Sequence, residues 1–527
     1  MKHLRVVILW VSVLVMPNLH AYDFAEYCTF TKGEADCSSE LMMLMDIASE
    51  TNEPIYLGAN NIFRIDSVDT SAHLISGISI IGDKTSVIKT DRFFLRDIDN
   101  LKISGVKIEG INVSIGSNTQ DTAMISFGGS PGMPNAKNIT LVNNFFSQSA
   151  EDILNIRSAS NVVVSNNEFR LAGLAMRSTI SESNGVYDER PKGSAIGMLN
   201  VDDVLVSDNR IFESKKTGIF VDSLNHTSKN ISIFNNHIDL LSFSNPTWRY
   251  GLKGGAGIYF VQGSNFSNIS VTGNAIYNAK MNALRLNGNK VIARNNRVDM
   301  DDTCSFIPEN VDKAILNSIA IKSHFIDDAI IRDNCIANYS VGVHLESWGE
   351  IKDVTVDKNK VFSPNSGVVV EHKYGGVYNN VRVVNNAIYG SKTNGYVFRS
   401  ALPSTGNMLV GNSLVNNQVQ NPSGINSGGP MVFIQNQTDF YYENNWIEGG
   451  NTSINWNFLV IENVDNSIFK RSSFKLNSTA DKNSAGIYIK SGSDNNYFDR
   501  INFYQFSQGI HDFGVSNKFS LVKYIGE

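Results

Sequence analysis

The fold is decided by a short phrase that recurs along the chain, first as Asn138-Ile-Thr-Leu-Val-Asn-Asn144 and again as Asn161-Val-Val-Val-Ser-Asn-Asn167. Each copy reads as a short strand followed by a polar turn. The first residue of the closing pair varies, whereas the second is Asn in all eleven copies. Those residues are Asn144, Asn167, Asn209, Asn236, Asn274, Asn296, Asn334, Asn359, Asn386, Asn412 and Asn445. Composition alone cannot place Asn at one phase of eleven copies.

Each copy belongs to a longer repeat. Successive asparagines of this set are 22 to 42 residues apart, as if one turn of a solenoid needs at least 22 residues and loops supply the excess. The repeat also holds a Gly-led strand, as in Gly218-Ile-Phe-Val and Gly257-Ile-Tyr-Phe, and a short third strand such as Glu168-Phe169. Three strands per turn, stacked in parallel, predict an all-β solenoid of the parallel β-helix type.

The asparagines are expected to serve the turn and the stack together. A tight turn favours a residue that tolerates left-handed or bridging dihedrals. When turns stack about 4.8 Å apart, side-chain amides can donate and accept hydrogen bonds along the axis. We therefore expect the second Asn of each pair to form a continuous ladder.

Residues 38–90 read as the capped end of the solenoid. Ser38 or Ser39 can cap a helix near residues 40–50, and Ile55-Tyr-Leu-Gly-Ala then begins the strands. The helix would plug the first coil with Leu41, Met42, Leu44, Met45 and Ile47. With this helix, the strand Ile78-Ser-Ile-Ile-Gly-Asp-Lys-Thr-Ser-Val-Ile and the Asn-ended coils, the chain resembles the pectate-lyase-like superfamily of right-handed parallel β-helices.

The resemblance implies a single β-helix domain at residues 22–527, with a capping segment at 22–54 and coils from about 55 to 520. In that superfamily the substrates are nearly always polysaccharides, bound in a groove on the face of the first strand and its flanking loops. No catalytic signature of the family is present to be carried over residue by residue, so the resemblance specifies the fold and not the reaction.

The amino terminus indicates an exported protein, and the net charge argues against nucleic acid as a partner. Lys2 and Arg5 precede the apolar run Val6–Met16, and Ala21 is a small residue at the expected cleavage site of a signal peptide spanning 1–21. No later run approaches the roughly 18 apolar residues of a membrane helix. The 45 basic and 51 acidic residues give a net charge of -6, which disfavours nucleic acid as a partner. We expect a secreted or periplasmic monomer.

The four cysteines fit an oxidising compartment. Cys28 lies close to Cys37, and Cys304 lies about one repeat before Cys335. Among the three possible connectivities we expect the local pairs, 28 with 37 and 304 with 335. A zinc site is disfavoured because no CxxC pair or His cluster accompanies them.

Stacked coils allow the outward residues of the Gly-led strands to be read as columns. The first column is expected to hold Phe220, Tyr259, Arg285, Ala320, His344, Val369 and Val397. The second is expected to hold Asp222, Val261, Asn287, Lys322, Glu346, Glu371 and Arg399. Aromatic and charged residues gather in the middle coils, which is typical of a sugar-binding groove. From these columns Phe220, Asp222, Asn287 and Arg399 are candidate substrate-binding residues.

Elimination from a uronic acid polymer is the first functional hypothesis. It needs a cation on the carboxylate and a base near the adjacent proton. Arg285, Lys322 and His344 can supply both, and Ala320 would leave a gap for one sugar ring between Arg285 and His344, about 10 Å apart. Tyr259 is a competing base or a stacking platform.

Two alternatives remain open. Glycoside hydrolysis needs two carboxyl groups about 5 to 9 Å apart, which Glu346 and Glu371 on adjacent coils could provide. The same charges could also be an ordinary exposed ion ladder. The fold equally permits a protein that only binds carbohydrate, such as an adhesin or matrix protein.

Two insertions before Gly-led strands are expected to form groove walls. They are Tyr187-Asp-Glu-Arg-Pro-Lys-Gly193 and Trp248-Arg-Tyr-Gly-Leu-Lys253, so Trp248, Arg249 and Tyr250 are further candidates for substrate binding. Asp301-Asp302 lacks the spacing of a calcium loop. We therefore expect no cofactor and no metal.

Overall fold

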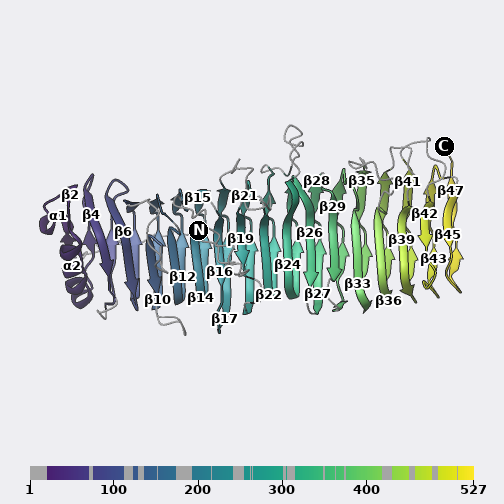
Figure 1. Ribbon diagram of the computed structural model, residues 1–527, viewed down its shortest axis with the longest axis horizontal. Helices are drawn as coiled ribbons and strands as arrows, with labels where there is room; N and C mark the ends of the chain where they lie inside the picture. The colour runs from purple at the N-terminus through teal and green to yellow at the C-terminus, as the bar shows by residue number, and fades with distance from the viewer. Residues whose placement is uncertain are drawn as a thin grey trace, which may run out of the picture.

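The computed structural model shows one long solenoid of parallel strands, with helices α1 and α2 at one end and the C-terminal strands at the other (Figure 1). It describes residues 21–70, 75–111, 123–128, 136–150, 152–173, 193–214, 216–240, 255–261, 263, 265–279, 281–300, 304, 315–347, 350–362, 364–372, 376–417, 430–449, 457–476, 485–506 and 508–526. The signal-peptide prediction falls almost wholly outside these residues, as do both predicted groove walls except Gly193.

The strands form three parallel sheets that run the length of the solenoid. The first sheet, which contains the Gly-led strands, comprises β9 (Ile125–Gly128), β16 (Thr217–Asp222), β19 (Ala256–Phe260), β26 (Tyr339–Ser347), β29 (Ser366–His372), β33 (Tyr396–Thr405), β36 (Val432–Thr438), β39 (Asn457–Asp465), β42 (Ala485–Ile489) and β45 (Gln508–Asp512). The longer strands β12 (Leu154–Ser165), β14 (Ser194–Ser207), β22 (Asn282–Arg294) and β24 (Ile315–Arg332) continue from the first sheet into the second.

The second sheet leads into the Asn turns. It comprises β1 (Tyr22–Asp23), β3 (Ile55–Tyr56), β5 (Ser79–Ile81), β7 (Asp99–Ser104), β10 (Ala136–Val142), β17 (Thr227–Phe234), β20 (Asn265–Thr272), β27 (Ile351–Asp357), β30 (Tyr378–Asn379), β31 (Arg382–Val384), β34 (Met408–Val410), β37 (Tyr441–Glu443), β40 (Ile468–Lys470), β43 (Tyr497–Asp499) and β46 (Lys518–Ser520).

The third sheet follows the Asn turns. It comprises β2 (Lys32–Asp36), β8 (Lys107–Gly110), β11 (Phe145–Ser147), β13 (Glu168–Arg170), β15 (Arg210–Ser214), β18 (His237–Leu240), β21 (Ala275–Tyr277), β23 (Arg297–Val298), β25 (Cys335–Ala337), β28 (Lys360–Phe362), β32 (Ala387–Tyr389), β35 (Ser413–Asn417), β38 (Trp446–Gly449), β41 (Ser473–Leu476), β44 (Asn502–Tyr504) and β47 (Lys523–Ile525). In the first coils, β4 (Ile62–Asp69) and β6 (Val87–Arg96) lead from this sheet into the first.

The Asn ladder is present and buried. From Asn144 to Asn412, each ladder Asn donates a hydrogen bond from its backbone N–H (2.9–3.1 Å) and another from Nδ2 (2.8–3.3 Å) to Oδ1 of the next. Asn445 ends the series by donating to the Ser472 hydroxyl. The predicted continuous ladder is therefore confirmed.

One detail of the prediction was wrong. The left-handed conformation belongs to the first residue of each pair, with φ of 52° to 58° at Asn, Asp and Lys, and not to the ladder Asn. These first residues are Asn143, Asn166, Asp208, Asn235, Gly273, Asn295, Asp333, Lys358, Asn385, Gly411 and Asn444. The two tasks are divided because a residue at positive φ needs only a tolerant backbone, whereas the ladder needs an amide.

The Gly that leads many strands of the first sheet has a steric cause. A Cβ on Gly218 would lie 2.6 Å from Cγ2 of Ile238 in the core, so a larger residue cannot fit without displacing the third sheet. Ala283 and Ala320 stand at the corresponding position of β22 and β24 and are fully buried. A small residue at this corner therefore sets the register of the first sheet.

A helix lies at the amino-terminal end of the solenoid, close to its position in the prediction. The helix α2 (Ser38–Thr51) buries Leu41, Leu44, Met45 and Ala48, and the short α1 (Phe24–Tyr27) packs beside it. The N-cap of α2 is Cys37 and not Ser38 or Ser39, because the Ser38 hydroxyl donates to Asp36 instead.

Both predicted disulfides are present. Cys28 is bonded to Cys37 at the capped end, and Cys304 is bonded to Cys335 in the middle of the third sheet. Within the described residues, no helix has the length and apolar character needed to cross a membrane.

Loss of one ladder amide is predicted to destabilise the whole solenoid. In Asn296→Ala, the N–H and Nδ2 of Asn274 lose their acceptor. We expect the free energy of unfolding to fall by about 1–3 kcal/mol. Asn295→Gly is the matched control because Gly accepts the φ of 54° at that position. Equal losses in the two variants, measured by chemical unfolding, would contradict a special role for the ladder.

Candidate functional site

The strand register defines which residues share the outer face of the first sheet. Its first column runs Phe220, Tyr259, Arg285, Lys322, His344, Val369, Val397, Phe433, Val460, Tyr488 and His511. Lys322 thus stands where Ala320 was expected, and Ala320 is buried in the core. The expected gap between Arg285 and His344 is filled by Lys322, because Leu284 pairs with Ile321 and not with Ile319.

The corrected register brings the predicted basic residues together. Arg285, Lys322 and His344 lie side by side on β22, β24 and β26. The Arg285 guanidinium lies 4.7 Å from the centre of the Tyr259 ring, and its Nη1 donates to the Tyr259 hydroxyl at 2.5 Å. Phe220 stacks on Tyr259 at 5.8 Å between ring centres. A row of aromatic rings therefore leads into a row of basic residues.

A β-bulge lies beside this row, next to a second histidine. Between Leu286 and Gly288 of β22, one residue faces two residues of β24, His324 and Phe325. Asn287 holds the bulge, because its Oδ1 accepts from the N–H groups of both (3.2 and 3.3 Å) and its Nδ2 donates to the Phe260 carbonyl at 2.7 Å.

Asn287 is consequently misplaced in the prediction. Only 1% of it is exposed, so it lies beneath the face on which a substrate-binding residue was expected. The strict alternation that predicted an outward Asn287 ends at the bulge.

His324 is a site residue that sequence reasoning missed. It follows Lys322 by two residues on β24 and therefore points to the same face, which the Lys322-Ser-His324 alternation could have indicated. Burial, together with the positive charges of Lys322 and Arg285, lowers the pKa of His324 to about 3. The imidazole is neutral near pH 7 as a result. We call Arg285, Lys322, His324 and His344 the cation cluster.

Two carboxylates border the cation cluster in the second column. Glu346 is 3% exposed and its Oε2 lies 2.8 Å from Lys322 Nζ and 4.0 Å from His324 Nδ1. Glu371 pairs with Arg399 at 2.7 Å and lies 3.8 Å from His344 Nε2. Both carboxylates of the hydrolase alternative are thus ion-paired with cations of the same face.

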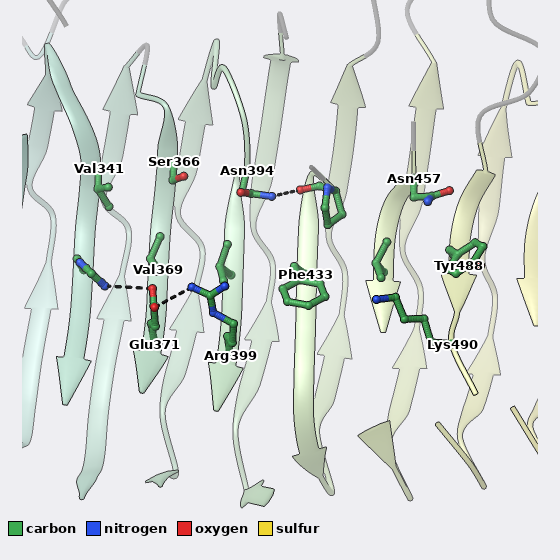
Figure 2. Close-up of a pocket in the computed structure, with 14 residues that line it drawn as sticks. Val341, Ser366, Val369, Glu371, Asn394, Arg399, Phe433, Asn457, Tyr488 and Lys490 are labelled. Carbon is green, nitrogen blue, oxygen red and sulfur yellow. Dashed lines mark hydrogen bonds and ion pairs between the residues drawn. The ribbon is translucent and has the colours of Figure 1, made fainter. Parts of the chain in front are cut away.

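A hollow of about 580 Å³ continues from His344 toward the C-terminal coils (Figure 2). Its floor is the apolar part of the first column, namely Val369, Val397, Phe433, Val460 and Tyr488. Glu371, Arg399 and Lys490 line one side, and Ser366, Asn394 and Asn457 line the other. Sequence reasoning missed Phe433, Val460 and Tyr488, although the same alternation in β36, β39 and β42 marks them as outward.

The remaining candidates are distributed as follows. Asp222 is largely buried and accepts from the Ser223 N–H at 2.7 Å, and Arg399 is exposed at the hollow. Trp248, Arg249 and Tyr250 lie outside the described residues, as does Asp301-Asp302. Among the residues that the structure describes, no group of three His, Cys, Asp or Glu side chains is arranged to hold a metal ion.

The sequence comparisons agree with the parallel β-helix described above. Residues 76–298 match the family described as right-handed β-helix region. The fold is a right-handed parallel β-helix. No curated protein matches the sequence.

Several solved structures resemble this β-helix at low identity. The A-module of mannuronan C-5 epimerase from Azotobacter vinelandii is 10% identical, with 96% of this chain and 99% of that chain covered and a TM-score of 0.35. DFA-IIIase from Arthrobacter chlorophenolicus without its lid is 13% identical, with 94% and 99% covered and a TM-score of 0.38. A surface adhesin of Streptococcus pneumoniae is 12% identical, with 96% and 99% covered and a TM-score of 0.38. None of these similarities assigns a function to the β-helix.

The lowered pKa of His324 predicts acid sensitivity. The unfolded chain takes up a proton near the ordinary value of 6.5, whereas the folded β-helix does so only near 3, so stability is lost as the pH falls between these values. Replacing His324 by Asn should reduce the stability difference between about pH 7.5 and about pH 4.5 by roughly 2 kcal/mol. His511→Asn removes a histidine from the same column at the last coil and is the matched control. If the two variants change the pH dependence of stability equally, His324 is not the origin of the acid sensitivity.

Proposed function

We propose that the protein is an exported lyase that cleaves an acidic exopolysaccharide, such as one of a capsule or biofilm matrix, by β-elimination. The observation that carries the proposal is the cation cluster, where two cations and two histidines share one face of the first sheet and one of them, His344, lies at the edge of the hollow. The two disulfides agree with an exported protein.

Each group of the cluster has a place in the reaction. Arg285 and Lys322 would bind the carboxylate of a uronate and stabilise the negative charge that develops when the adjacent carbon loses its proton. His344, on the neighbouring strand and at the edge of the hollow, would take that proton. The electron pair forms a carbon–carbon double bond as the glycosidic bond breaks, and the leaving oxygen takes a proton from solvent. Tyr259 would hold Arg285 in place.

The substrate itself would adjust the second histidine. Lys322 and Arg285 contribute to the low pKa of His324 after burial. A bound uronate would compensate their charge and raise that pKa.

Glycoside hydrolysis is the second candidate because Glu346 and Glu371 are paired in register on β26 and β29. The ion pair of Glu346 favours elimination over hydrolysis. A general acid must carry a proton, and an ion pair with Lys322 stabilises the charged form of Glu346.

The reaction class can be measured directly. We expect the purified protein to release oligosaccharides with an unsaturated uronate at the new end, detected by near-ultraviolet absorbance across a panel of acidic polysaccharides. New reducing ends without that absorbance would establish hydrolysis instead. Retention by the polysaccharide without any cleavage would identify a binding protein.

Variants separate the same mechanisms by residue. Alanine at Arg285, Lys322 or His344 should lower kcat by about 100-fold or more under elimination, because each group acts in the transition state. Lys475→Ala, which removes a lysine paired with Glu448 on the third sheet, controls for loss of an ion pair.

The carboxylates provide the opposite test. Glu346→Gln and Glu371→Gln should retain most activity under elimination, whereas either would abolish hydrolysis. A kcat near that of wild type in all three alanine variants would remove the cation cluster from the mechanism. Circular dichroism confirms that each variant is folded.

A further inference from the structure

The outer face of the first sheet changes character along the axis. Near β22, β24 and β26 the first column presents Arg285, Lys322 and His344. From β29 onward the same column becomes apolar, with Val369, Val397, Phe433, Val460 and Tyr488 as the floor of the hollow. A chain lying along this face would meet cations at the first position and an apolar surface at the next ones, where Figure 2 shows Val369, Phe433 and Tyr488 in one row.

The charged residues beside the hollow are already balanced. Arg399 pairs with Glu371 at 2.7 Å, and Lys490 pairs with Glu462 at 2.5 Å. The two cations of this stretch are therefore matched by two carboxylates, whereas at the cation cluster a single carboxylate, Glu346, lies beside both Lys322 (2.8 Å) and His324 (4.0 Å). A carboxylate of the ligand placed here would lie close to Glu371 or Glu462, and like charges repel.

The opposite side of the hollow is polar but neutral. Ser366, Asn394 and Asn457 line it, and the Asn394 amide donates to the Pro430 carbonyl. Amides and hydroxyls of this kind hydrogen-bond sugar hydroxyls, whereas apolar and aromatic side chains on the floor pack against the C–H face of a sugar ring. The neutral side and the floor of the hollow therefore suit uncharged sugars.

We infer that the substrate is a heteropolysaccharide in which an acidic sugar is followed by neutral sugars, and not a homopolymer of uronate. The acidic sugar binds at the cation cluster, and the neutral sugars bind along the hollow between β29 and β42. This inference rests on the proposed function in one respect, since it takes the cation cluster as the place of the acidic sugar.

Binding is measured separately from cleavage. Affinity electrophoresis compares retention of the protein by polygalacturonate, which carries a uronate at every position, with retention by a set of alternating polymers, in which each uronate is followed by two or more neutral sugars, gellan among them. We expect at least one alternating polymer to bind about 10-fold more tightly than polygalacturonate. If none of the alternating polymers binds more tightly than polygalacturonate, the inference is overturned.

Variants of the floor assign the binding to the hollow. Phe433→Ala and Val397→Asp should weaken retention by the preferred alternating polymer about 10-fold or more, with KM affected more than kcat wherever cleavage occurs. Tyr497→Ala and Ile330→Asp alter side chains that are 41% and 40% exposed on the second sheet, and they are the matched controls. Unchanged retention in both floor variants would overturn the inference.

The outcomes keep the two proposals apart. Selective retention that depends on Phe433 and Val397, without any cleavage, would uphold the neutral-sugar hollow and remove the lyase function. Cleavage of polygalacturonate as efficient as that of every alternating polymer, with both floor variants unaffected, would uphold the lyase and remove the heteropolymer inference.

Discussion

In-register stacking of parallel strands is the constraint on which the rest of the structure depends. Each coil repeats the hydrogen bonds of its neighbours at about 4.8 Å along the axis, so that every inward position must suit the position above and below it. The Asn ladder shows this constraint most clearly, because each side-chain amide from Asn144 to Asn412 is hydrogen-bonded to the next. Replacement of one rung affects its neighbour directly.

The same stacking leaves the outer face unconstrained by the core. Once the small residue at the corner and the inward aliphatic residues fix the backbone, the side chain at each outward position can vary with little effect on packing. The first column shows this freedom, since it passes from aromatic rings to basic residues and then to an apolar floor. Chemistry is therefore arranged along the axis by residue type, while the sheet itself stays uniform.

The sequence predicted the fold well because the repeat signals are redundant. Eleven asparagines and the Gly-led strands recur with a spacing that a solenoid explains. The register was predicted correctly wherever Gly218, Gly257, Gly342, Gly367 or Gly395 marks the corner, and it was wrong at β24, where the marker is Ala320. A shift of two residues preserves the alternation of inward and outward positions, so hydrophobic pattern alone could not detect it.

The site was harder to predict because it departs from the repeat. The bulge buries Asn287, which regular alternation places on the outer face, and a strictly periodic reading of the strands has no place for an extra residue. Bulges redirect side chains at the edges of functional sites, and this one leaves a neutral imidazole close to two cations and to Glu346. Glu346 partly offsets the charge of Lys322 at 2.8 Å, while burial and the charges of Lys322 and Arg285 keep the imidazole unprotonated. Under the proposed function, the carboxylate of a bound uronate would add negative charge beside the two cations and would raise the pKa of His324.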